Sequence, residues 1–313
     1  MRRLFLGRIF GSAATLLGMS MLAFLLVALA PGDPITAELR FMGVPANPAT
    51  VDALRRQYDL DAPIAQRYVR WAGRVVRLDL GTSIANGRPV TDELARALPS
   101  TLALAVLSLA FIVVLSLGAG AAASLRPGGF GARTLQALTV AVSSVPLYWL
   151  ALAAVVVGSV TLGVTTVVSA TWKENLLLPA MLLALGPGLS IGRVVRQKII
   201  DERLEDYVRL SAVVGQAPWR ILVLEIGRVV VPSLASMWAN SFGFLLGGSV
   251  VIERIFDRPG LGNLALQAIA ARDYPVLQAY LMLAGLLFIS VNWTADLFSA
   301  WVDPRLRRGG IHA

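Results

Sequence analysis

Six long apolar runs dominate this chain, and each is long enough to cross a lipid bilayer as a helix. A hydrocarbon core of about 30 Å needs ~20 mainly apolar residues of helix. Charged residues make up only 15% of the 313 positions, which indicates that lipid is the solvent of much of the chain. The runs predict an all-α polytopic membrane protein with six transmembrane helices, at Ile9–Ala30, Thr101–Leu125, Thr134–Val160, Leu176–Gly192, Val229–Ile252 and Ala279–Val302.

Small residues and prolines recur inside these runs. Pro179 and Pro187 interrupt the fourth run, which a membrane helix tolerates where its neighbours satisfy the freed carbonyls. Small residues let helices approach closely in a solvent that gives no hydrophobic push between them. The candidates for helix packing or for lining a pathway are Pro146, Gly247, Gly248, Asn292 and Asp296.

Motifs that carry chemistry are few. The chain has no cysteine, its single histidine is His312, and it contains no Gly-x4-Gly-Lys-[Ser/Thr] phosphate loop. We therefore predict no catalytic residue, no metal ligand and no ATP site. Asp296 is the one clear acid inside a run, either as a substrate or coupling group or, the interpretation we prefer, as a paired helix-end carboxylate. An ion-coupled transporter, the remote alternative, would need more such groups.

The distribution of basic residues predicts the orientation. With a cytoplasmic N-terminus, fifteen Lys and Arg residues fall inside, whereas the short outside loops hold only Lys173, Arg254, Arg258 and Arg272. Because Lys and Arg mark cytoplasmic loops, both termini are expected in the cytoplasm, and the +9 net charge needs no nucleic acid to explain it. The first run resembles a secretory signal, but it exceeds the ~7–15 apolar residues of one, so we expect it to remain as a span.

One sizeable segment, Pro31–Pro99, lies outside the membrane on the far side. Apolar residues at three- and four-residue spacing predict short amphipathic helices at Thr50–Tyr58 and Ile64–Leu78. We therefore expect two parts. Residues 1–100 would hold the first span and this segment, and residues 101–305 the other five spans with a cytoplasmic loop at 193–228.

That cytoplasmic loop carries a second amphipathic pattern. Leu204, Val208 and Ala212 recur at every fourth position, which predicts a helix between Asp201 and Val214. The helix should end at Gly215, because glycine readily takes the left-handed conformation. Such a helix suits docking into a groove on a cytoplasmic partner, and a helix lying in the headgroup region is the alternative.

The same loop resembles the EAA motif of binding-protein-dependent permeases, which reads Glu-Ala-Ala, three residues, Gly, and a proline further on. The chain reads Arg209-Leu210-Ser211, three residues and Gly215, followed by Pro232. The peptide/nickel branch of the family has Arg-Thr-Ala, so Arg209 fits while Leu210 and Ser211 depart. The resemblance implies an ATPase-docking helix made of Glu205, Asp206, Tyr207, Val208, Arg209, Leu210, Ser211, Ala212 and Gly215.

Further stretches resemble the peptide/nickel branch in the same order along the chain. They are Ala30-Pro-Gly-Asp-Pro34, Leu80-Gly-Thr-Ser83, Arg88-Pro-Val90, Leu98-Pro-Ser-Thr101, Ser144-Val-Pro-Leu-Tyr-Trp149, Gly247-Gly-Ser-Val-Val-Ile-Glu253, Arg258-Pro-Gly-Leu-Gly262, Arg272-Asp-Tyr-Pro275 and Asp303-Pro-Arg305. The chain is therefore similar, over essentially its whole length, to permease subunits of the dipeptide, oligopeptide and nickel ABC importers.

The resemblance implies a type I importer permease (MetI-like) core, preceded by an N-terminal helix and a small extracytoplasmic helical segment, in the bacterial inner membrane. It implies a second homologous permease subunit, two cytoplasmic ATPase subunits that bind ATP and Mg, and an extracytoplasmic substrate-binding protein. The implied cargo is a peptide, or nickel or a nickel chelate. Without cysteine or an intramembrane histidine, the chain offers no soft site for a bare metal ion.

Overall fold

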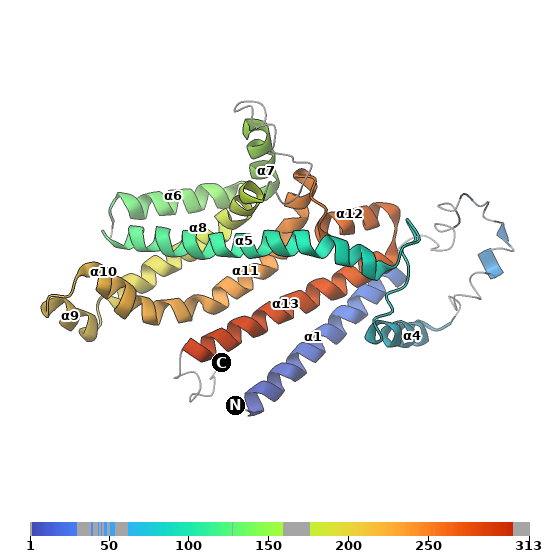
Figure 1. The fold of residues 1–313 in the computed structure, drawn as a ribbon, viewed down its shortest axis with the longest axis horizontal. Coiled ribbons are helices and arrows are strands. Elements are labelled where there is room, and N and C mark those ends of the chain that lie inside the picture. The colour runs from blue at the N-terminus through green and yellow to red at the C-terminus, as the bar shows by residue number, and fades with distance from the viewer. Residues whose placement is uncertain are drawn as a thin grey trace. The chain divides into compact units, whose positions relative to one another are not determined.

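The computed structural model describes residues 2–29, 39, 43, 45, 47–48, 51–53, 62–126, 128–158 and 176–302, and within its helices it leaves out the side chains of 2–9, 295–296 and 298–302. No strand occurs in this part of the chain, where one isolated bridge joins Thr82 and Pro89. The main helices (Figure 1) are α1 (Arg2–Ala28), α4 (Ile64–Val76), α5 (Val90–Ser124), α6 (Phe130–Ser144), α7 (Leu147–Val156), α8 (Leu177–Glu202), α9 (Asp206–Val213), α10 (Pro218–Arg220), the π-helix η3 (Ile221–Ile226), α11 (Gly227–Ile255), α12 (Leu261–Ala271) and α13 (Tyr274–Val302).

Five of the described helical segments are long and apolar enough to cross a membrane, in agreement with an all-α polytopic protein. They are Phe10–Ala28, Val90–Ser124, Leu177–Glu202, Pro218–Ile255 and Tyr274–Thr294. A sixth crossing exists if the bent pair α6 and α7 counts as one span.

The third predicted span is not one helix. α6 and α7 meet at an angle of 97°, and Val145 between them is extended, with φ −106° and ψ 123°. Pro146 explains the break, because proline disfavours the helical conformation in the residue before it. The prediction of a single helix over Thr134–Val160 is therefore wrong at this point.

Other helix boundaries also differ from the prediction. α5 begins at Val90 rather than Thr101 and continues through Pro99, and its first turn holds Asp92 and Glu93, which the helix dipole favours there. The predicted helix at Ile64–Leu78 is confirmed as α4. α12 has no counterpart among the helices expected from the sequence.

Several predictions fall on residues outside the described ranges. Of the helix predicted at Thr50–Tyr58, only residues 51–53 are described, and these are helical. The motifs at Ala30–Pro34 and Asp303–Arg305, and His312, lie outside the described residues altogether.

The chain forms two compact units, one of residues 1–99 with 259–289 and one of residues 100–258 with 290–313. The first unit has a core of buried side chains from the start of α5, from α12 and from the start of α13, namely Val90, Leu94, Ala97, Leu261, Ala268, Val276 and Ala279. In the same unit α4 packs on α1. The division at residue 100 expected from the sequence stays a prediction.

The second unit depends on close helix approaches at glycine. A Cβ added to Gly120 of α5 would lie 2.6 Å from the Val195 Cβ and 2.7 Å from the Gly192 carbonyl oxygen of α8. A Cβ at Gly188 would lie 2.8 Å from Leu115. Small residues at these positions let the α5 and α8 backbones approach, as expected in a membrane.

Four helices, α4, α9, α11 and α12, end in the same turn. In each, a left-handed residue follows the helix, and the next amide donates to a carbonyl five residues earlier, for example Arg258 to Glu253 at 2.7 Å. Glycine takes the left-handed position only in α9. The other three positions are occupied by Leu78 (φ 61°), Asp257 (φ 49°) and Arg272 (φ 55°).

Candidate functional site: a docking helix and a membrane groove

The helix predicted between Asp201 and Val214 exists as α9 but is shorter than expected. It begins at Asp206 rather than Asp201, because Asp201 and Glu202 complete α8 and three residues then connect the two helices. Glu205 precedes α9 with extended backbone, and Asp206 places a negative charge in the first turn, which the helix dipole favours.

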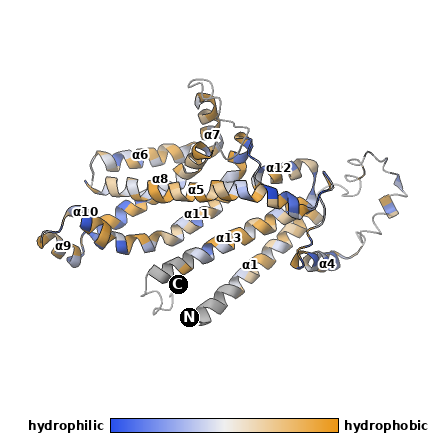
Figure 2. Cartoon of the chain, in the orientation of Figure 1, coloured by the Kyte–Doolittle hydropathy of each residue, from blue (hydrophilic) through white to orange (hydrophobic). Residues whose placement is uncertain are grey.

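α9 exposes most of its apolar side chains. Of the predicted apolar face only Val208 is buried, while Leu204 precedes the helix and Ala212 is exposed. The largest exposed apolar side chains lie elsewhere, and we call them the α9 patch: Leu210, Val213, Val214 and Trp219, exposed by 64%, 83%, 74% and 61%. Exposed apolar residues gathered on one short loop are typical of a protein-binding surface (Figure 2).

Gly215 ends α9 as predicted. Its φ is +82°, its amide donates to the Ala212 carbonyl at 3.1 Å, and the Gln216 amide donates to the Ser211 carbonyl at 3.1 Å. A Cβ at Gly215 would meet nothing within 4 Å. The position therefore needs glycine for its backbone conformation and not for space.

The polar side chains of α9 fix its first turn. The Tyr207 hydroxyl donates to the Glu202 carboxylate, and the Ser211 hydroxyl donates to the Tyr207 carbonyl at 3.0 Å. Partial burial, followed by the hydrogen bond to Glu202 and by nearby negative charge, raises the pKa of Tyr207, so it stays a neutral donor. Arg209 is exposed beside them.

The base of the loop is tied to a neighbouring span. Arg203 donates to the Ser124 carbonyl at 2.8 Å, and Arg196 donates to the Ala123 carbonyl at 3.3 Å. Both acceptors belong to the last turn of α5, where helix carbonyls lack intrahelical donors and cations are favoured. A displacement of the loop would therefore be transmitted to α5 as well as to α8.

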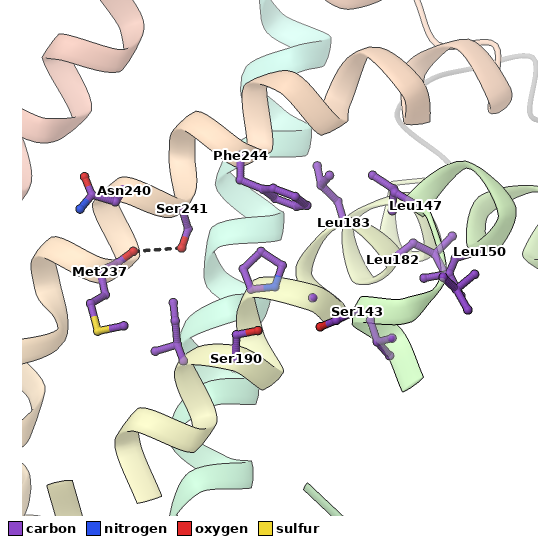
Figure 3. Close-up of a pocket in the computed structure, with 15 residues that line it drawn as sticks. Ser143, Leu147, Leu150, Leu182, Leu183, Ser190, Met237, Asn240, Ser241 and Phe244 are labelled. Carbon is purple, nitrogen blue, oxygen red and sulfur yellow. Dashed lines mark hydrogen bonds between the residues drawn. The ribbon is translucent and has the colours of Figure 1, made fainter. Parts of the chain in front are cut away.

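A groove of about 650 Å³ lies in the same unit (Figure 3). Its wall combines the break between α6 and α7, the part of α8 around Pro187, and the middle of α11. Most of the described lining residues are apolar, none of them is charged, and their polar side chains are Ser143, Ser190, Asn240 and Ser241. Ser241 donates to the Met237 carbonyl at 3.0 Å, as Figure 3 shows.

The predicted pathway residues fall in different places. Pro146 stands at the break, between the groove residues Val145 and Leu147. Gly248 is a packing position, since an added Cβ would lie 2.6 Å from Leu183, whereas Gly247 faces open space. Two further candidates lie on α13: Asn292 is half-buried, and the Asp296 side chain is outside the described residues.

Two buried polar clusters were missed, although their residues belong to motifs that the sequence displays. In the second unit Glu253 accepts from Thr101 at 2.6 Å, and Arg258 donates to Ser100 at 3.5 Å. Burial lowers the pKa of Arg258, and the nearby charge of Glu253 offsets only part of this shift. In the first unit buried Asp273 is the centre of the second polar cluster.

Asp273 binds one loop at three points. It accepts from the Ser83 hydroxyl, from the Ile84 amide at 3.2 Å and from the Ala85 amide at 3.3 Å. These partners lie far apart in sequence, so no local periodicity could have revealed either cluster. In the described part of the chain, no group of three or more His, Cys, Asp or Glu residues could hold a metal ion.

Two family models match the chain. The model described as binding-protein-dependent transport system inner membrane component matches residues 112–308, and the model of the N-terminal part of such membrane components matches residues 1–105.

Relatives match over almost the whole length. A putative peptide transport system permease protein of Brucella abortus (strain 2308) is 35% identical over 316 residues, covering 98% of this chain and 99% of that protein. The glutathione transport system permease protein GsiC of Escherichia coli (strain K12) is 33% identical over 301 residues, covering 96% and 97%. A chain of the inward-facing MetNI methionine ABC transporter shares the fold, with a TM-score of 0.57 and 21% identity over 69% of this chain and 98% of that one.

Proposed function

The chain belongs to the family of binding-protein-dependent transport system inner membrane components, and from this premise we propose that it forms half of the pathway through which an ABC importer moves peptides. It is a multi-pass inner-membrane permease subunit, and ATP hydrolysis takes place in separate subunits. We further propose two such ATPase subunits, which bind ATP and Mg, a second homologous permease subunit and one binding protein.

The exposed α9 patch is the observation that carries this proposal. Leu210 and Val213 project from a helix that is fixed by Tyr207 on one side and by the Gly215 turn on the other. A short helix with apolar residues exposed is suited to a groove on a partner. Closure of the ATPase subunits would move α9, and the arginine contacts to α5 would pass that movement to the spans.

The groove supports a peptide as the cargo. Neutral hydroxyl and amide groups in an otherwise apolar wall can bond to peptide amides while apolar side chains of the cargo stay dry. Among the described residues that line it, none offers a carboxylate, imidazole or thiolate ligand for nickel. The relatives named for peptide and glutathione transport support the same cargo.

The orientation depends on whether α6 and α7 cross the membrane together. If the pair crosses, α9 lies on the same side as the N-terminus, and both termini are cytoplasmic. If the pair turns back, the loop 193–228 with its seven basic residues lies outside, against the positive-inside rule. We therefore propose that the bent pair crosses.

A glycine pair tests the docking role. Gly215 and Gly128 have similar conformations, with φ +82° and +78°, and neither has a neighbour within 4 Å of an added Cβ. Gly215→Val and Gly128→Val should each strain the backbone of their own loop to a similar extent, but only Gly215→Val should disturb docking through α9. In the reconstituted complex, peptide uptake should fall about tenfold, equivalent to ~1.4 kcal/mol of lost docking energy. Gly128→Val should leave it unchanged.

Equal uptake and equal ATPase stimulation in the two variants would contradict the docking role. Uptake that survives removal of the ATPase subunits and collapses with the proton gradient would instead favour an ion-coupled transporter. Native mass spectrometry of the ligand carried by the cognate binding protein separates a peptide from nickel or a nickel chelate.

A further inference from the structure

α4 is fixed to the end of the first span. The Phe24 ring of α1 lies 5.6 Å from the Tyr68 ring and 5.7 Å from the Trp71 ring, and the Ser20 and Tyr68 hydroxyls are 2.7 Å apart. The span ends at Ala28. At 1.5 Å per residue, the contacts therefore lie within about 12 Å of the end of the span. This geometry holds α4 at the boundary of the bilayer.

The faces of α4 that do not contact α1 differ in polarity. No residue of α4 is buried, and Val69 and Val76 are exposed by 68% and 83%. These two valines are seven residues apart and so share one face, beside the face that carries Tyr68. The arginines fall on the other side of the helix, where Arg67 and Arg74 are also seven residues apart.

We propose that α4 lies along the membrane surface, with Val69 and Val76 in the boundary between headgroups and acyl chains and with Arg67 and Arg74 at the level of the lipid phosphates. A strongly amphipathic helix with arginines on its polar side binds an interface in this way, with its apolar face ~5–10 Å deep. Exposed apolar side chains of α1, such as Leu22 and Leu26, continue the same lipid-facing surface. Arginine stems reach phosphates while their own methylenes cover apolar surface.

The natural chain contains no cysteine, so single cysteines can report the depth of each face. Spin labels would be placed at V69C and V76C on the apolar face, and at R70C and R74C as exposed positions on the arginine side of the helix. The full chain would be held in nanodiscs of phosphatidylethanolamine and phosphatidylglycerol. Power-saturation measurements compare accessibility to oxygen, which concentrates in lipid, with accessibility to a water-soluble nickel chelate.

The proposal expects an oxygen-to-chelate accessibility ratio several-fold higher at V69C and V76C than at R70C and R74C. Equal ratios at all four positions would overturn it. It would also be overturned if V69C and V76C became shielded from the chelate only after a purified binding protein is added, since the face would then belong to that protein. Nanodiscs expose both membrane faces, so the result does not depend on the proposed orientation or on transport.

Discussion

Asp273 joins two stretches of chain that lie 190 residues apart. Its carboxylate is buried and receives one hydroxyl and two backbone amides from the loop before α5. The loop also has hydrogen bonds of its own, such as Ser83 to the Arg88 carbonyl at 2.8 Å, and a bridge between Thr82 and Pro89, so Asp273 holds an already folded loop in place. At the residue scale, one acid therefore fixes the surface that precedes the second span.

Replacing Asp273 by Ala should lower the stability of the chain strongly. The half-buried amides of Ile84 and Ala85 would lose their acceptor, at a cost of about 1.5–3 kcal/mol for a hydrogen bond to a charged group. The thermal unfolding midpoint in detergent measures the effect. Asp79→Ala is the control, since exposed Asp79 accepts only the Gly81 amide in the same loop. Equal shifts for both variants would mean that burial of Asp273 contributes nothing.

Residues whose role is local could be predicted from the sequence. Gly215 follows from helix periodicity and from the known conformational freedom of glycine, and Val208 follows from the same periodicity. The pairs of Asp273 with Ser83 and of Glu253 with Thr101 could not be predicted, because a hydrogen bond between distant segments leaves no periodic trace. The α9 patch was missed because the helix is two turns long, too short for a four-residue pattern to define its faces.

At the scale of elements, the packing depends on how closely the helices cross. α5 and α8 approach closely at Gly120, where an added Cβ would meet the backbone carbonyl of Gly192 as well as Val195. A flexible side chain could move aside, whereas a backbone carbonyl in a packed helix cannot. Within α5 the close approach falls at Gly120 and not at Gly118, where an added Cβ would meet nothing within 4 Å.

Gly120→Ala should therefore destabilise the chain by about 1–3 kcal/mol, the usual cost of overpacking. Gly118→Ala adds the same methyl group to the same helix in open space, and it should be neutral or slightly stabilising because alanine favours helix. The yield of folded protein and its unfolding midpoint, measured side by side, check the difference. A neutral Gly120→Ala would show that α5 and α8 can separate without cost.

The apolar runs predicted which spans exist, but they did not predict where the helices begin and end. The break at Pro146 was within reach of the sequence, since the residue before a proline resists the helical conformation. Hydropathy alone concealed it, because the run stays apolar through the bend. α12 was hidden for a related reason: an eleven-residue apolar helix is too short to be recognised as a span.

At the scale of the whole molecule, the membrane topology depends on how many times the chain crosses the bilayer. Five spans place the two termini on opposite sides of the membrane, and six place them on the same side. Single cysteines at Arg126, Gln216 and Asp257, all exposed, can decide between them in intact cells. A membrane-impermeant maleimide should label only D257C. Labelling of Q216C would show that α6 and α7 turn back, and it would remove α9 from the cytoplasm.

Three helix ends carry a consequence for anyone who purifies this protein. Leu78, Asp257 and Arg272 hold a left-handed backbone that costs a residue with a side chain roughly 1–2 kcal/mol. Glycine would relax the backbone at these three positions, so substitutions to glycine there are expected to stabilise the chain outside its spans. Leu78→Gly is the simplest of these changes for a more stable preparation in structural work, because Leu78 is exposed and has no described side-chain partner.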